Sequence, residues 1–172
     1  MKDYTDEEIS RLITCDKVIV EPPRKDMRSV DGHKRNGMKL QSKDGNDDFT
    51  VFMRVNEAFP ENFSIGLVVH PKDVPGDVHL LRCNGPHGDY NGTLTTDPND
   101  IHPHFCHHVH KATEANIRDG FLPERTAVRT KGYAAFEDAL TFFVTETNIL
   151  GIEQHIDIQP QLGLFTEPEA IQ

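Results

Sequence analysis

The stretch that most strongly decides the fold and the site is HPHFCHHVHK, residues 102–111, which holds five of the ten histidines. In a β-strand, successive side chains point to opposite faces. One face would carry His102, His104, Cys106, His108 and His110. The other would carry the mostly apolar set Pro103, Phe105, His107 and Val109. This alternation predicts a strand that packs on a core with one face and presents imidazoles outward with the other.

A helix is the alternative for the same stretch. Pro103 suits the first position of a helix, and Ile101, Phe105 and Val109 would then share a stripe. Histidine, phenylalanine and valine are not strong helix formers, however, and Thr113 is a better N-cap for a helix that starts at Glu114. The strand is therefore the favoured interpretation.

Composition limits the class of protein. A chain of 172 residues can form one domain, residues 1–172, with a real core. It has no apolar run of membrane-spanning length, and its acidic first residues do not resemble a secretory signal. The cysteines Cys15, Cys83 and Cys106 are odd in number and show no paired spacing. Reduced thiols and a cytoplasmic location are expected, with no membrane partner.

The net charge of −10 disfavours contact with a phosphate backbone unless the basic residues are gathered in one place. One window does gather them. This pattern predicts either an RNA-binding surface or a sheet edge guarded by positive charge. The residues that would contact RNA are Arg24, Lys25, Arg28, Lys34 and Arg35.

Two helices are predicted. Thr5 and Glu8 match a capping box, so a helix is expected over residues 6–16. Tyr133, Phe136 and Leu140 lie at helical spacing, which predicts a helix over residues 133–147 that covers a sheet. Residues 152–172 are expected to form an edge strand or a loosely attached tail.

The middle of the chain predicts β-structure. Apolar and polar residues alternate in several runs between residues 37 and 111, with a turn at residues 44–47. Short connections favour an antiparallel meander. Residues 24–36 show no period and are expected to be a loop, and a short strand is expected at residues 126–129. The predicted fold class is α+β, with an antiparallel sheet of about five or six strands.

Metal binding is one function that these residues suggest. Imidazole and thiolate are good zinc ligands. His104, Cys106 and His108 would stand on one strand face, and His87 in the neighbouring Gly/Pro-rich loop could add a ligand. No paired CxxC or HxxxH spacing accompanies them.

Metal-independent RNA cleavage is the favoured function. Attack by the 2′-hydroxyl needs a base, an acid and a cation that holds the phosphate. Histidine suits both proton roles and arginine suits the phosphate. The predicted catalytic set is Arg82, His87, His108 and His110, with no cofactor.

A protein partner is the non-enzymatic alternative. Acidic proteins of this size can occupy a basic groove on another protein, as inhibitors do. The carboxylates that would then matter are Asp44, Asp47, Asp48, Asp97 and Asp100.

Three runs of sequence carry a resemblance to other proteins. They are residues 62–67 (NFSIGL), residues 80–88 (LLRCNGPHG), and the His-rich strand followed by residues 111–114 (KATE). Together they resemble an uncharacterised family of small bacterial and phage proteins, a domain of unknown function, over about residues 20–143. A looser similarity is to the toxin partners of toxin–antitoxin pairs, which favours the nuclease interpretation.

Overall fold

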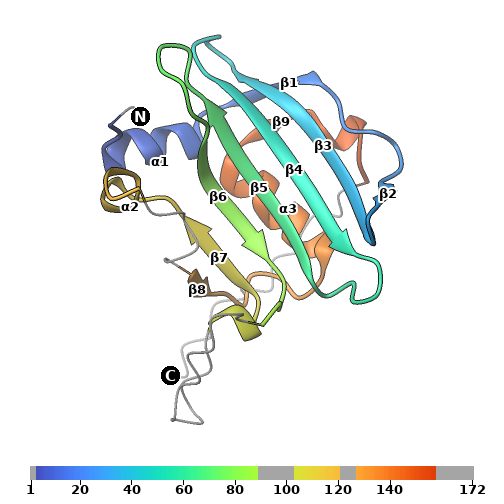
Figure 1. Cartoon of the computed structure of the whole chain (residues 1–172). Coiled ribbons are helices and arrows are strands. Elements are labelled where there is room, and N and C mark those ends of the chain that lie inside the picture. The colour runs from blue at the N-terminus through green and yellow to red at the C-terminus, as the bar shows by residue number, and fades with distance from the viewer. Residues whose placement is uncertain (1–2, 89–102, 121–126, 158–172) are drawn as a thin grey trace, which may run out of the picture.

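The computed structural model describes residues 3–88, 103–120 and 127–157, and within them a nine-stranded sheet with the two longer helices packed on one face (Figure 1). The strands run in the order β8-β7-β6-β5-β4-β3-β1-β9, and β2 pairs with β3. They are β1 (Lys17–Glu21), β2 (Arg28–Val30), β3 (His33–Ser42), β4 (Asp48–Asn56), β5 (Phe63–His70), β6 (Val78–Asn84), β7 (His108–Lys111), β8 (Ala127–Arg129) and β9 (Ile149–Leu150).

The predicted α+β class is confirmed, but five or six strands was too low a number. The strands that escaped prediction are short or lie at the margins of the sheet, where few residues show an alternating pattern. β9 pairs parallel with β1, so the sheet is mixed rather than purely antiparallel. Elsewhere the paired strands are antiparallel, as the short connections predicted.

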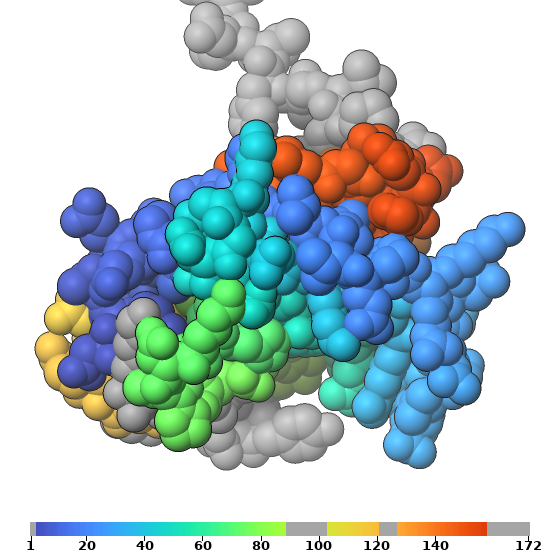
Figure 2. Space-filling view, turned by 90° about the horizontal axis from the view of Figure 1, so that it is seen from above, coloured from blue at the N-terminus to red at the C-terminus, as the bar shows by residue number. Residues whose placement is uncertain are grey.

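The prediction of a loop over residues 24–36 was wrong. This segment contains β2 and the start of β3, joined by a tight turn at Asp31 and Gly32, which have φ of 50° and 73°. An Asp-Gly pair in such a conformation is a strong hairpin signal, and the charged residues around it hid the strand pattern. The β2–β3 hairpin, in light blue, stands out from the body of the molecule in Figure 2.

Both predicted helices are present. α1 (Asp6–Thr14) begins with the predicted capping box, in which Thr5 and Glu8 bond reciprocally. α3 (Phe136–Thr147) begins three residues later than predicted, and Asn148 in the left-handed conformation ends it. α3 lies behind β4 and β5 in Figure 1. The short helices are η1 (Pro103–Phe105), α2 (Glu114–Arg118) and η3 (Ile152–Gln154).

The core lies between the sheet and the helices. Alternate residues of β4 and β5 are buried there, as their sequence patterns predicted, together with Phe143 of α3 and Ile152 of η3. Residues 158–172, the rest of the predicted tail, lie outside the described residues. In the described part of the chain, no helix has the length and apolar character needed to cross a membrane.

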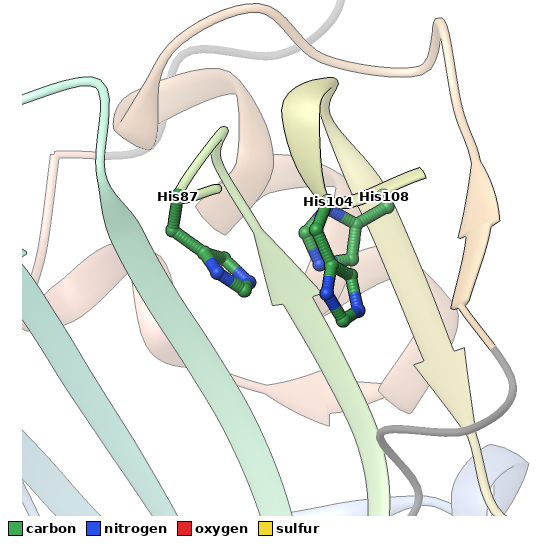
Figure 3. Close-up of side chains that lie close together, drawn as sticks. All are labelled: His87, His104 and His108. Atoms are coloured by element: carbon green, nitrogen blue, oxygen red, sulfur yellow. The ribbon is translucent and has the colours of Figure 1, made fainter. Parts of the chain in front are cut away.

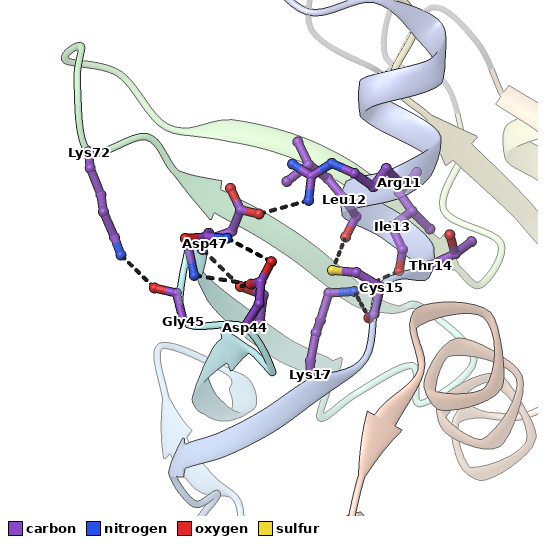
Figure 4. A network of polar contacts seen from close by, with 12 residues as sticks. Arg11, Leu12, Ile13, Thr14, Cys15, Lys17, Asp44, Gly45, Asp47 and Lys72 are labelled. Atoms are coloured by element: carbon purple, nitrogen blue, oxygen red, sulfur yellow. Dashed lines mark hydrogen bonds and ion pairs between the residues drawn. The ribbon is translucent and has the colours of Figure 1, made fainter.

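Lys17 joins the C-terminal ends of two helices, and its side chain is fully buried. Figure 4 shows it beside Ile13 and Cys15 at the end of α1. Its Nζ donates hydrogen bonds to the carbonyls of Ile13 (2.7 Å), Cys15 (2.8 Å) and Thr147 (3.0 Å). A cation at a helix C-terminus is favourable because the last carbonyls lack partners within the helix. Burial nevertheless lowers the pKa of Lys17. This lysine fixes α1 against α3 beneath the sheet.

The prediction of one strand over residues 102–110 was wrong in its first half. Residues 103–105 form the 3-10 helix η1, and the amide of Cys106 donates to the Pro103 carbonyl at 2.9 Å. Proline at the first helical position explains this start. β7 begins only at His108, and His102 lies outside the described residues.

The predicted exposure of the two faces was also wrong. His108 and His110 are fully buried, whereas Phe105, which was expected in the core, is 52% exposed. Val109 does pack toward the core, as predicted. The imidazoles are buried because they pack against one another on the sheet face opposite α3.

Candidate metal centre

Three histidines from three segments converge on the sheet face opposite α3 (Figure 3). His87 follows β6, His104 belongs to η1 and His108 begins β7. The ring centroids of each pair are 4.8–5.0 Å apart. One nitrogen from each ring lies within 4.8 Å of the other two. Among the described residues, this is the group of histidine, cysteine and acidic side chains that could hold a metal ion.

The glycine-rich loop after β6 brings His87 to this position. Gly85 passes so close to the chain before β5 that a Cβ there would lie 1.8 Å from the Glu61 carbonyl oxygen, so only glycine fits. Two residues later the His87 amide donates to the His104 carbonyl at 2.9 Å. This backbone bond ties the loop to η1 and holds the two rings together.

Backbone carbonyls fix the orientation of two of the rings. Nδ1 of His108 lies 2.8 Å from the Cys106 carbonyl oxygen, and Nδ1 of His87 lies 3.1 Å from that of Gly88. Each carbonyl can only accept a hydrogen bond, so Nδ1 carries the hydrogen, and in the neutral ring Nε2 is left with its lone pair. The Asn84 amide nitrogen lies 3.2 Å from Nε2 of His108 and 3.4 Å from Nε2 of His87, as a donor to both lone pairs would.

The charge state of His108 also suits a ligand. Burial, joined by the nearby His87, His104 and Arg82, lowers its pKa from the ordinary 6.5 to about 4, although the bond to Cys106 opposes the shift. The ring is therefore neutral at pH 7. A neutral imidazole can bind a metal ion but cannot donate a proton as a general acid.

Tyr133 holds the two strands that carry the site. Its hydroxyl donates to the His108 carbonyl at 2.6 Å and accepts from the backbone N–H of Asn84 at 3.1 Å. Burial raises the pKa of this phenol, so it remains a protonated donor. The neighbouring Cys83 is equally buried, and burial raises the pKa of its thiol to about 12. Cys83 is therefore an inert packing residue and not a nucleophile.

All four residues of the predicted catalytic set lie in this region. Arg82 is paired directly with His110 across β6 and β7. The His110 ring lies 4.9 Å from that of His108. His87 completes the set through its contact with His108.

The predicted metal set is assembled differently. His104 and His108 come together, and His87, expected as an additional ligand, is the third member of the group. The group does not include the Cys106 thiol. Cys106 contributes its carbonyl oxygen, which lies 2.8 Å from Nδ1 of His108 and orients that ring. Asn84 and Tyr133 were missed by sequence reasoning. Asn84 stands within the quoted LLRCNGPHG motif and could have been found there, whereas Tyr133 appeared only as part of a helical apolar stripe.

The residues predicted to contact partners lie away from this cluster. Asp47 forms an ion pair with Arg11 at 3.0 Å, and Asp44 accepts bonds from Ser42 and Asn46, which lower its pKa. Asp97 and Asp100 lie outside the described residues. The predicted basic residues are exposed on the loop before β2 and on the β2–β3 hairpin.

Comparison of the chain with protein-family models, with curated proteins and with solved structures found no match. The resemblance to an uncharacterised bacterial and phage family therefore stays a prediction.

Proposed function

We propose that this protein binds one divalent transition-metal ion, such as Zn²⁺, through His87, His104 and His108, and uses it for hydrolysis. The observation that carries the proposal is the convergence of three imidazole nitrogens within 4.8 Å of one another. Nitrogens on a tetrahedral zinc ion stand roughly 3.3 Å apart at bond lengths of about 2.0–2.1 Å. Modest rotations of the rings would close this difference.

The surroundings of the ligands support the same function. Metal-bound histidines usually donate their second ring nitrogen to a carbonyl or carboxylate, which fixes the ring. His87 and His108 both do so. Three protein ligands are typical of catalytic zinc sites, because a fourth position stays available for water. Arg82 adds a positive charge beside the site that suits a phosphate ester.

Metal titration tests this proposal. After removal of bound metal with a chelator, calorimetry with Zn²⁺ should give one ion per chain. His104→Ala and His108→Ala should each weaken binding by about 100-fold or more, because each removes a ligand. His79→Ala is the matched control, since His79 is exposed and lies outside the cluster. Absence of zinc binding by the parent protein, or equal binding by all variants, would contradict the metal site.

Metal-independent RNA cleavage is the second candidate, and the direct pairing of Arg82 with His110 favours it. In this reaction Arg82 would hold the phosphate while His87 and His110 exchange protons. Cleavage of a labelled RNA that persists in EDTA and is lost on the double change His108→Ala, His110→Ala would support it. Cleavage that needs added Zn²⁺ would instead support the metal-dependent reaction.

A further inference from the structure

One cross-strand row runs over a single face of the sheet and connects the histidine cluster to three arginines in β2, β3 and β4. In the β-sheet register each member of the row is paired directly with the next, from β2 to β8. Directly paired residues point to the same face of a sheet. The contacts Ser64–Asn84 (2.8 Å) and Asn84–His108 (3.2 Å) agree with this. The row is Arg28, Arg35, Arg54, Ser64, Asn84, His108 and Arg129.

Three of the four arginines in this row, those in β2, β3 and β4, form a concentrated positive surface on a chain of net charge −10. Arg28, Arg35 and Arg54 are exposed, and within the described part of the chain none forms an ion pair with a carboxylate. Like charges paired directly across strands are unfavourable, so a bound anion would relieve their repulsion. Neighbouring strands are about 4.8 Å apart, which places Arg54 about 14 Å from His108.

An aromatic ring lies beside the arginines on the same face. Phe52 stands two residues before Arg54 and is paired with Gly37 on one side and Gly66 on the other. Its ring lies over Gly66, where a Cβ would be 2.3 Å from the ring carbons. The missing side chain at Gly66 leaves room for this half-buried ring to lie over the backbone, and His79 contacts the ring edge-on with centroids 5.9 Å apart. Positive charge next to an aromatic platform is the usual combination in proteins that bind single-stranded nucleic acids.

We propose that this face binds single-stranded nucleic acid, with backbone phosphates on Arg28, Arg35 and Arg54 and a base on Phe52. The row leads the bound strand toward the histidine cluster. The inference deepens the proposed function by naming its substrate class, but the binding itself does not require the metal. An anionic membrane would bind the charges, but the Phe52 ring is half-buried over Gly66 and is poorly placed to insert between lipids. The nucleic acid is therefore the ligand that fits both features.

Fluorescence anisotropy with a labelled 20-nucleotide strand, oligo(U) or oligo(dT), tests the proposal in the presence of EDTA. We expect the triple variant Arg28→Ser, Arg35→Ser, Arg54→Ser to bind at least tenfold more weakly at 50 mM salt. The slope of log affinity against log salt should fall in magnitude by about 2, since each neutralised phosphate of a single strand contributes about 0.7. Phe52→Ala should weaken binding by about tenfold with little change in this slope, because it removes stacking and no charge.

The matched control is the triple variant Arg24→Ser, Lys25→Ser, Lys34→Ser. It also removes three positive charges, all from the loop before β2 and from β3, at residues that the sequence had suggested as RNA contacts. Lys34 points to the opposite face from Arg35, however, and none of the three belongs to the row. The control should bind within threefold of the parent. Equal losses of affinity in both triple variants, or no binding by the parent, would overturn the proposal. So would an arginine variant that loses affinity for anionic vesicles, used in place of the strand, but keeps its affinity for the strand.

The two proposals fail in different ways. The arginine variant should keep the zinc affinity of the parent, and His104→Ala should keep its affinity for the oligonucleotide. A parent protein that binds the strand in EDTA but no zinc would refute the metal site and retain the nucleic-acid surface. The reverse result would refute this inference and retain the metal site.

Discussion

The side-chain amide nitrogen of Asn84 lies 3.2 Å from Nε2 of His108, so the amide occupies the lone pair that a metal ion would use. The other end of the amide is fixed, because its oxygen accepts a hydrogen bond from the Ser64 hydroxyl at 2.8 Å. Asn84 therefore satisfies the buried imidazole in the metal-free protein. Metal binding must replace this hydrogen bond.

The change Asn84→Asp should tighten metal binding. In this variant a carboxylate oxygen replaces the amide NH₂ and faces two nitrogen lone pairs. The oxygen and the lone pairs repel one another in the metal-free state, and a bound cation attracts all of them. Carboxylate oxygen is also a zinc ligand. We expect the affinity for Zn²⁺ to rise by about tenfold or more in a competition titration with a chromogenic chelator. Asn62→Asp makes the same chemical change outside the cluster and should leave the affinity unaltered. An unchanged or lower affinity in Asn84→Asp would contradict the site.

The change Tyr133→Phe should destabilise the protein and loosen the site. It leaves the buried backbone N–H of Asn84 without its acceptor and removes the donor to the His108 carbonyl. An unsatisfied buried group costs about 1–3 kcal/mol, which urea unfolding would measure. Zinc affinity should fall as well, since the phenol positions both strands of the site. Phe143→Leu, a core change remote from these contacts, should lower stability and keep the affinity. Equal zinc affinity in Tyr133→Phe and the parent would show that the phenol does not position the site.

Local patterns predicted the regular part of the fold well. The capping box at Thr5 and Glu8 fixed the start of α1, and the alternation in β4 and β5 identified the buried face of the sheet. These patterns succeed because each depends on residues that are neighbours in sequence. β9 could not be recognised, because its two residues pair in parallel with β1, which lies more than 125 positions earlier in the chain.

The site was only partly predictable for a related reason. The motif around Asn84–Gly88 and the histidines at 104 and 108 pointed to the right segments, but the sequence does not encode which nitrogen faces which neighbour. The buried state of His108 arises because loop, η1 and β7 close on one another, an arrangement fixed by the His87–His104 backbone bond. The arginine row has the same origin, since Arg28, Arg35 and Arg54 become neighbours only through the register of three strands.

The change Lys17→Met should destabilise the protein strongly, although it puts an apolar side chain in a buried position. It leaves the carbonyls of Ile13 and Thr147 without their buried donor at the ends of α1 and α3. We expect the free energy of unfolding to fall by about 2 kcal/mol or more. Lys39→Met is the control, because Lys39 is exposed and makes an exposed ion pair with Glu21, and such pairs contribute little. If the two variants lost equal stability, Lys17 would not connect the helices energetically.

The stability of the metal-free protein should fall in acid, and His108 should cause part of this fall. Its pKa is about 4 in the folded protein and near the ordinary 6.5 in the unfolded chain, so between these values the unfolded state binds more protons. Its contribution to the free energy of unfolding is therefore fully present above pH 6.5 and is lost as the pH falls toward 4, with a slope of at most about 1.4 kcal/mol per pH unit.

Urea unfolding of the parent and of His108→Gln, compared at several pH values, isolates this contribution from that of the carboxylates. The stability difference between the two proteins should shrink from pH 7 to pH 4. A difference that stays constant over this range would mean that His108 is not held neutral by its burial.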